Sequence, residues 1–260
     1  MSRFHSAILA ALLVMGGALA AAPAVVVISD STAVDYTLKK SNPIAGTAAW
    51  EPMAGWGTYA RLSTRPGVVF RNLSAGGHSS KTYVERLLPN ARKRFPEGGW
   101  LLLSFGSNDA RKSASAPGRT TTPEETFPFY MGQIAAAAKE KGMRVVVLSP
   151  LPFYHREHGG FSCSVLAPYA AAAKKFADDN GFFFIDVFAL MSGRFAAMSD
   201  EEVRTNFMFL EPGRYANWPK GRKDPLHYTE KGSKLVWSVI HAEIERNIPE
   251  LAKLLVPEAR

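Results

Sequence analysis

A serine near one end of the chain and an acid–histidine pair near the other are placed where they could carry out nucleophilic catalysis. Ser31, in the Ser-Asp-Ser-Thr segment 29–32, directly follows an apolar run, and a turn there would expose its hydroxyl and free its backbone N–H. Asp224 precedes His227 by three residues, so its carboxylate could hold the Nδ1–H of the imidazole and leave Nε2 to accept a serine proton. Taken alone, each is also an ordinary capping or turn feature.

Two segments between these ends contain groups that could stabilise an oxyanion. In 72–80, the pair Gly76 and Gly77 lets the backbone approach a substrate oxygen closely and donate an N–H, and in 106–109 the amide of Asn108 can donate from the side. Each segment alone could be an ordinary turn between a strand and a helix. All four segments, however, fall at separate loops on the same edge of the predicted sheet, in a fixed order along the chain.

The elements that must position these groups alternate between apolar strands and helices. The candidate strands lack strict polar alternation, as expected when both faces of a sheet are buried; they are 25–29, 68–73, 100–105, 144–149 and 182–186. Candidate helices have capping or glycine stop signals, and they are 122–141, 168–180 and 229–247. This order predicts an α/β fold, a three-layer α/β/α sandwich around a central, mostly parallel five-stranded sheet.

Long irregular stretches are expected at the carboxyl ends of the strands, where open α/β sheets bind ligands. They are 34–66, 110–121, 151–168 and 189–226, and they contain many aromatic side chains, which stack well on sugar rings or simply pack in loops. From these, and from the glycine segment, we expect Trp56, His78, Tyr154 and Trp218 to contact substrate.

Length and the N-terminal pattern predict one exported domain. The 260 residues, 47% of them hydrophobic, suffice for one well-buried domain and are too few for two ordinary ones. Arg3 and the small, apolar run 7–20 predict a signal peptide, 1–20, cut after Ala20 to leave the domain 21–260 in the periplasm or extracellular medium. The run is short for a membrane span, so we expect no stable insertion after cleavage, an N-terminal anchor being the alternative.

Charge and cysteine content limit the partners and the source of stability. The chain has 31 basic and 23 acidic residues, a balance that favours anionic partners such as nucleic acid or acidic polysaccharide. The basic residues are scattered in pairs rather than in a dense run, so we expect a solvated surface and no nucleic-acid binding. Cys163 is the only cysteine, which excludes an intramolecular disulfide. Oligomeric state is not predicted.

The order of these segments resembles that of the SGNH, or GDSL-type, hydrolases, which contribute serine, glycine, asparagine and histidine in this order over essentially the whole domain. The resemblance implies a flavodoxin-like fold with Ser31 as nucleophile, Gly77 and Asn108 as oxyanion donors beside the Ser31 N–H, Asp224 as acid and His227 as base. The choice of Gly77 rather than Gly76 depends on the residues that follow.

Within that class the sequence looks most like the rhamnogalacturonan acetylesterase group. The similar segments are Asp30-Ser31-Thr32, Gly55-Trp56-Gly57, the stretch from Gly77 to Tyr83, Phe105-Gly106-x-Asn108-Asp109 and Asp224-x-x-His227. Four positions depart from the family pattern: Ser29 stands for a glycine, Ser107 for a frequent histidine, and His78 and Lys81 for arginines. None of these departures removes a catalytic group, but they bear on the substrate.

The resemblance implies a serine esterase that removes O-acetyl or other short acyl groups, plausibly from a pectic polysaccharide such as rhamnogalacturonan. Acyl transfer by these groups needs no metal and no organic cofactor. A zinc site in the His-Arg-Glu-His segment 155–158 is disfavoured because the segment lacks a third ligand and the pattern of a helical zinc protease. A lipid or other small acyl-ester hydrolase, and a non-catalytic carbohydrate-binding protein, are the alternatives.

Overall fold

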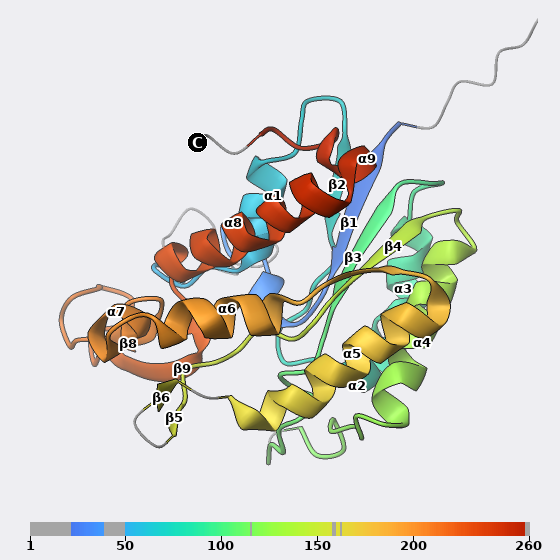
Figure 1. The fold of residues 1–260 in the computed structure, drawn as a ribbon. Helices are drawn as coiled ribbons and strands as arrows, with labels where there is room; N and C mark the ends of the chain where they lie inside the picture. The colour runs from blue at the N-terminus through green and yellow to red at the C-terminus, as the bar shows by residue number, and fades with distance from the viewer. Residues whose placement is uncertain (1–21, 39–49, 115, 158–159, 162, 258–260) are drawn as a thin grey trace, which may run out of the picture.

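A five-stranded parallel sheet runs through the centre of the computed structural model (Figure 1), which describes residues 22–38, 50–114, 116–157, 160–161 and 163–257. The strand order is β2-β1-β3-β4-β7. These strands are β1 (Ala24–Ile28), β2 (Val69–Asn72), β3 (Trp100–Ser104), β4 (Arg144–Leu148) and β7 (Phe183–Ile185). The predicted sheet is confirmed, with β1 shifted by one residue toward the N-terminus and the other four strands one or two residues shorter than predicted. The predicted signal peptide lies outside the described residues, and no described helix is long and apolar enough to span a membrane.

Helices cover both faces of this sheet, because alternate residues of each central strand belong to separate apolar clusters. In β1, Val25 and Val27 pack in one cluster with helices α1 (Trp56–Leu62), α6 (Val187–Ala196) and α8 (Glu230–Asn247). Val26 and Ile28 pack in the other cluster with helices α2 (Ser80–Arg86), α4 (Thr126–Lys139) and α5 (Ala167–Asn180). Figure 1 shows these two sets of helices on opposite sides of the strands. The three-layer sandwich predicted from continuous apolar strands is therefore confirmed.

The predicted helices form with small differences at their starts. They are α4 (Thr126–Lys139), α5 (Ala167–Asn180) and α8 (Glu230–Asn247), the last capped by the Thr229 side chain. Helix α4 begins four residues later than predicted. Its start is capped by Thr122 and Thr126, whose hydroxyls each accept the other's backbone N–H, at 3.2 and 2.7 Å, in place of a glutamate capping box.

Segments to which the sequence analysis assigned no helix or strand contain several further elements. The helices are α1 (Trp56–Leu62), α2 (Ser80–Arg86), α3 (Leu88–Ala91), α6 (Val187–Ala196), α7 (Asp200–Arg204), α9 (Pro249–Ala252) and the 3-10 turns η1 (Ser31–Ala33), η2 (Arg92–Arg94) and η3 (Ser164–Leu166). Two antiparallel pairs join β5 (Arg156–Glu157) to β6 (Gly160–Phe161) and β8 (Phe207–Leu210) to β9 (Arg222–Tyr228). Most are too short to show a clear hydrophobic period in the sequence.

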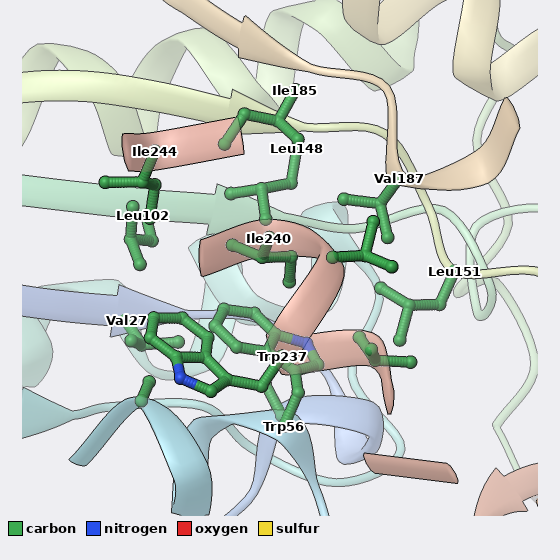
Figure 2. Packing of buried hydrophobic residues seen from close by; sticks show 14 of the residues in the cluster. Val27, Trp56, Leu102, Leu148, Leu151, Ile185, Val187, Trp237, Ile240 and Ile244 are labelled. Carbon is green, nitrogen blue, oxygen red and sulfur yellow. The ribbon is translucent and has the colours of Figure 1, made fainter. Parts of the chain in front are cut away.

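Helix α1 anchors the segment that follows β1, and its first residue corrects a prediction. The Trp56 side chain has no exposed surface and stacks on Trp237 of α8, with ring centroids 6.2 Å apart and planes 1° from parallel. Figure 2 shows both indoles packed beside Val27 and Ile240 in the core. Trp56 is therefore a core residue, and its predicted contact with substrate is wrong because a fully buried ring cannot touch one.

The backbone of α1 lies directly against the turn η1 at Gly57. A Cβ atom at this position would lie 2.2 Å from the Ala33 carbonyl oxygen and 2.3 Å from the amide nitrogen of Asn72. That amide donates a 2.7 Å hydrogen bond to the same Ala33 carbonyl, so it ties η1 to the end of β2. Only glycine allows α1, η1 and β2 to meet this closely.

Gly57→Ala is expected to lower the free energy of unfolding by about 1–3 kcal/mol, because the added methyl group must displace backbone atoms of η1. The matched control is Gly193→Ala in α6, where a Cβ atom meets nothing within 4 Å and the residue is exposed. That control should raise stability by up to about 1 kcal/mol through helix propensity. Urea unfolding of both variants measures the difference, and equal effects would contradict the close packing at Gly57.

Candidate active site

Ser31 is held at the carboxyl end of β1 by a short, tightly bonded turn. It opens η1, whose start is capped by Asp30: the Asp30 carboxylate accepts the backbone N–H of Thr32 at 2.9 Å and its hydroxyl at 2.7 Å. The Tyr36 hydroxyl donates to the Ser31 carbonyl at 3.1 Å. Ser31 is 6% exposed, so its position is fixed by neighbours on most sides while its hydroxyl still borders a pocket.

The sequence suggested that Asp224 and His227 lie in an irregular stretch before α8. In the structure both residues lie on strand β9. Asp224 pairs with Met208 of β8, and Tyr228 pairs with the adjacent residue Phe207. Residues 225–227 therefore bulge out of the ladder between two neighbouring pairs, which bends the strand and changes the direction of its side chains. Pro225 sits in this bulge, where no ladder N–H is needed.

The bulge brings His227 between Ser31 and Asp224. The His227 Nε2 atom is 2.9 Å from the Ser31 Oγ, and its Nδ1 atom is 2.7 Å from Asp224 Oδ2. An ionised carboxylate can only accept, so Nδ1 carries the hydrogen and Nε2 is left to accept the serine hydroxyl. This is the geometry in which an imidazole acts as base toward a serine.

The Asp224 carboxylate is surrounded by donors. Its Oδ1 atom accepts the backbone N–H groups of Leu226 at 2.9 Å and His227 at 3.1 Å, while Arg222 donates to Oδ2. Burial by itself raises the pKa of Asp224, but the hydrogen bond and charge of His227, joined by Arg222, hold that pKa well below its ordinary value. Asp224 is therefore an ionised partner for the imidazole across the working pH range of most proteins.

Ser31 and His227 open into a pocket of about 470 Å³ between the loops that follow β1 and β2. Its lining combines glycine backbone, aromatic and aliphatic side chains and one cation, from Ser31, Val34, Tyr36, Trp50, Met53, Ser74, Ala75, Gly76, Gly77, Arg222 and His227. A larger hollow of about 600 Å³ lies between α4 and α5, but its lining has no nucleophile beside a base. The smaller pocket is therefore the candidate active site.

Of the two predicted oxyanion segments, the first lines the pocket with Ser31, and the second is hydrogen-bonded to the first through Asn108, which is not among the lining residues. Gly76 and Gly77 both line the pocket, and Gly77 has a φ of +76°, which a side chain would disfavour. Asn108 is buried after β3, and its amide donates one 2.9 Å hydrogen bond to the His78 carbonyl. A side-chain amide has a second N–H, so this bond links the two segments and still leaves a donor for an oxyanion.

Asp109 ties the connection between β3 and α4, to which it belongs, to the start of α2, a role that the sequence did not reveal. Its fully buried carboxylate accepts the backbone N–H of Ser80 at 3.1 Å, the Ser80 hydroxyl, and the Thr121 hydroxyl at 3.1 Å. Burial raises the pKa of Asp109 to about 6, opposed by the bonds from Ser80 and Thr121 and reinforced by the nearby charge of Asp30. The only sign of this role in the sequence was an aspartate within a predicted turn directly after a buried strand, where a carboxylate needs hydrogen-bond donors.

The other three predicted substrate contacts, Tyr154, Trp218 and His78, are not among the residues that line the pocket. Tyr154 donates to Asp200 at 2.6 Å and packs on Phe209, with ring centroids 5.0 Å apart. The Nε1–H of Trp218 donates to the Glu51 carbonyl at 2.9 Å, and the Trp218 ring makes a cation–π contact with the guanidinium of Arg222. The ring of His78 is half-buried, and its carbonyl serves Asn108.

Several lining residues were given no role by the sequence analysis. Tyr36, Trp50, Met53 and Arg222 come from segments expected to be irregular, and only the aromatic content of those segments hinted at the first two. Among the described residues, no group of three or more His, Cys, Asp or Glu side chains is gathered where it could hold a metal ion.

Comparison with known proteins places these residues in a recognised sequence pattern. A family model described as the GDSL-like Lipase/Acylhydrolase family matches residues 30–235. The chain is 30% identical over 195 residues to rhamnogalacturonan acetylesterase RhgT of Bacillus subtilis, covering 75% of this chain and 82% of that protein. It is 25% identical over 169 residues to a rhamnogalacturonan acetylesterase of Emericella nidulans, covering 58% of this chain and 68% of that protein.

Solved structures share the fold at lower identity. Axe2, an acetylxylan esterase from Geobacillus stearothermophilus, superposes with a TM-score of 0.58 at 15% identity, covering 85% of this chain and 94% of that chain. A lipase/acylhydrolase from Enterococcus faecalis gives a TM-score of 0.52 at 17% identity, covering 92% of this chain and 100% of that chain. The predicted flavodoxin-like α/β fold is confirmed.

The raised pKa of Asp109 predicts a pH dependence of stability. The unfolded carboxyl titrates near pH 3.9, so folding favours the protonated form, and the stability this contributes is present below about pH 4 and lost as the pH rises through about 6. Asp109→Asn removes this titration. The fall in unfolding free energy between about pH 4 and pH 7 should therefore be smaller in Asp109→Asn than in the wild type, as measured by urea midpoints.

The control for this measurement is Asp179→Asn, at an exposed carboxylate paired with Lys175 on the surface of α5. It should follow the wild-type pH dependence closely. A pH dependence in Asp109→Asn as steep as that of the wild type would show that Asp109 does not titrate in this range.

Proposed function

Because this chain belongs to the GDSL-like lipase/acylhydrolase family, and is an SGNH hydrolase of the rhamnogalacturonan acetylesterase type, we propose that it hydrolyses O-acetyl esters through Ser31, His227 and Asp224. Family membership makes it a carboxylic-ester hydrolase; the triad and the substrate are our proposal. The observation that carries the proposal is the chain of contacts from Ser31 Oγ to His227 Nε2 at 2.9 Å and from Nδ1 to Asp224 at 2.7 Å.

In the first half-reaction, Ser31 Oγ attacks the ester carbonyl carbon while His227 Nε2 takes the hydroxyl proton. The electron pair of the C=O bond moves to its oxygen, and this oxyanion accepts hydrogen bonds from the backbone N–H groups of Ser31 and Gly77 and from the Asn108 amide. The tetrahedral species then collapses. The C–O bond to the alcohol breaks, the alcohol oxygen takes the proton from His227, and the acyl group stays on Ser31.

In the second half-reaction, water replaces the alcohol. His227 accepts a proton from the water as its oxygen attacks the acyl carbon, and the same donors stabilise the second oxyanion. Collapse breaks the bond to Ser31 Oγ, which recovers its proton from the imidazole, and the carboxylic acid leaves. Asp224 keeps the imidazole in one orientation and stabilises its positive charge in both halves.

For the substrate we propose an acetylated polysaccharide of the pectic class. The support comes from the relatives, which are named rhamnogalacturonan acetylesterases, and from the excess of basic over acidic residues. The alternative is a hydrolase of lipid or other small acyl esters. The apolar wall formed by Val34 and Met53 beside Ser31 is the observation that favours it, because such a wall could take a longer acyl chain.

Export is part of this proposal, because a polysaccharide substrate is met outside the cytoplasm. It depends on the signal peptide predicted at 1–20, with 21–260 as the mature SGNH hydrolase domain. N-terminal sequencing of the protein recovered from the periplasm or medium of a bacterial host would test it. A mature chain that starts at Ala21 supports export, and recovery of the uncut chain in the cytoplasm alone contradicts it.

Ser31→Ala should lower the turnover of p-nitrophenyl acetate by about 10⁴-fold or more, because the attacking hydroxyl is lost. Release of p-nitrophenol measures this directly. The matched control is Ser164→Ala, at an exposed serine of η3, which should keep wild-type turnover. Turnover of Ser31→Ala within tenfold of the wild type would remove Ser31 as the nucleophile.

Asn108→Ala should lower kcat for the same ester by about 10²- to 10³-fold with a smaller change in KM, since the amide stabilises the oxyanion more than the ground state. Because Asn108 also bonds the His78 carbonyl, the thermal midpoint is measured in parallel. A fall in kcat below tenfold in a variant that stays folded would contradict the oxyanion role.

Substrate class is tested by measuring acetate released from acetylated pectins, xylans and glycans, beside p-nitrophenyl esters of increasing chain length. Higher kcat/KM on acetylated pectins than on xylans or longer acyl esters supports the proposal. A preference for long acyl chains would favour the lipid esterase alternative. Tight binding of pectin without any ester cleavage would leave only a carbohydrate-binding function.

A further inference from the structure

Arg222 contacts the proposed triad from outside it. It lies on β9 two residues before Asp224 and lines the pocket beside Ser31. Its Nε atom donates to Asp224 Oδ2 at 3.0 Å, and one of its Nη atoms donates to the same oxygen. That oxygen is the one that accepts the Nδ1–H of His227 at 2.7 Å, so the guanidinium and the imidazole meet on a single atom.

The guanidinium is itself held in place by Trp218. The Arg222 Cζ atom lies 4.4 Å from the centroid of the Trp218 ring, a cation–π contact, and its side chain is 28% exposed. Trp218 is fixed in turn by the bond from its Nε1 to the Glu51 carbonyl and by Trp50, whose ring centroid is 6.5 Å away. These contacts fix the orientation of the Arg222 guanidinium, so its N–H donors already point at the Asp224 carboxylate.

Together these contacts fix both oxygens of the carboxylate. Backbone N–H groups of Leu226 and His227 hold Oδ1, and Arg222 holds Oδ2. Without Arg222, only the Nδ1–H of His227 would hold Oδ2, and the two backbone bonds to Oδ1 alone would resist rotation about the Cβ–Cγ bond, which moves both oxygens and carries Oδ2 out of line with Nδ1. A small displacement of a group that orients a catalytic base is costly for the rate.

We propose that Arg222 is a positioning residue of this esterase, which locks the Asp224 carboxylate so that His227 faces Ser31. The proposal rests on the proposed function. It requires the planar, two-donor guanidinium and its stacking on Trp218, so a lysine, which offers a flexible point charge, cannot replace it. A competing role is direct binding of an anionic substrate group, because three of the five N–H bonds of the guanidinium are not used on Asp224.

A neutral, small substrate separates these roles, because p-nitrophenyl acetate has no anionic group to bind. With this ester, Arg222→Gln should lower kcat by about 10- to 100-fold and change KM by less than about threefold. Arg222→Lys keeps the positive charge but loses the planar pair of N–H donors, so it should recover less than about a third of the lost kcat. The matched control is Lys223→Gln, which removes the same charge from the exposed neighbouring residue of β9 and should leave kcat unchanged.

Chemical rescue protects the test against a folding defect. Guanidinium ion added at low millimolar concentration to Arg222→Ala should raise kcat several-fold, since the ion can occupy the vacated place between Trp218 and Asp224. The same addition should not raise kcat of Lys223→Gln. A merely structural arginine would give a lowered thermal midpoint and no rescue, and that pair of results would overturn the proposal.

Two further outcomes would also overturn it. One is Arg222→Gln with kcat for p-nitrophenyl acetate within about twofold of the wild type. The other is a loss confined to KM for anionic esters, which would make Arg222 a substrate-binding residue. Failure of the proposed function gives a different result. In that case Ser31→Ala would still hydrolyse p-nitrophenyl acetate, regardless of the results with the Arg222 variants.

Discussion

The hydrogen bond between Ser31 and His227 joins positions 196 residues apart, and the rest of the structure serves to hold its two ends. Ser31 follows β1, the sheet strand flanked by β2 and β3, whereas His227 lies on a hairpin outside that sheet. The hairpin is tied down beside it: the Ala54 N–H donates to the Tyr228 carbonyl at 3.0 Å, and the Tyr228 hydroxyl donates to the Pro152 carbonyl. Buried bonds of this kind keep one geometry, because breaking any of them leaves a polar group without a partner.

The bulge at 225–227 satisfies two demands that a regular strand could not. Asp224 and Tyr228 keep their ladder partners on β8, so the hairpin stays paired, while the intervening residues turn the imidazole toward Ser31. Tyr228 then returns to the core, where its ring packs on Phe207 with centroids 4.6 Å apart. His227 is thus held between two paired residues of the strand, and Arg222 at the start of the same strand donates to Asp224.

The sequence predicts most accurately where one physical effect dominates. The apolar runs of the sheet and the capped helix α8 were found because burial on both faces and a side-chain cap have plain local signals. Strand β9 was missed because Pro225 and its charged residues read as a turn, and only pairing with β8 makes it a strand. Trp56 was misplaced because a tryptophan after a glycine looks the same whether it faces a pocket or the core. The contact between Arg222 and Asp224 was missed for the same reason as β9, because side chains two residues apart share a face only when the segment is a strand.

The most direct measurement of the central claim is the identity of the acylated residue during turnover. Enzyme mixed with p-nitrophenyl acetate is quenched in acid within milliseconds, digested and mapped by mass spectrometry. We predict an acetyl group on the peptide that contains Ser31, localised to that side chain, and far less of it when His227 is replaced by alanine. Turnover that proceeds with the acetyl group on a different side chain, or with the same labelling in the absence of the imidazole, would contradict the account.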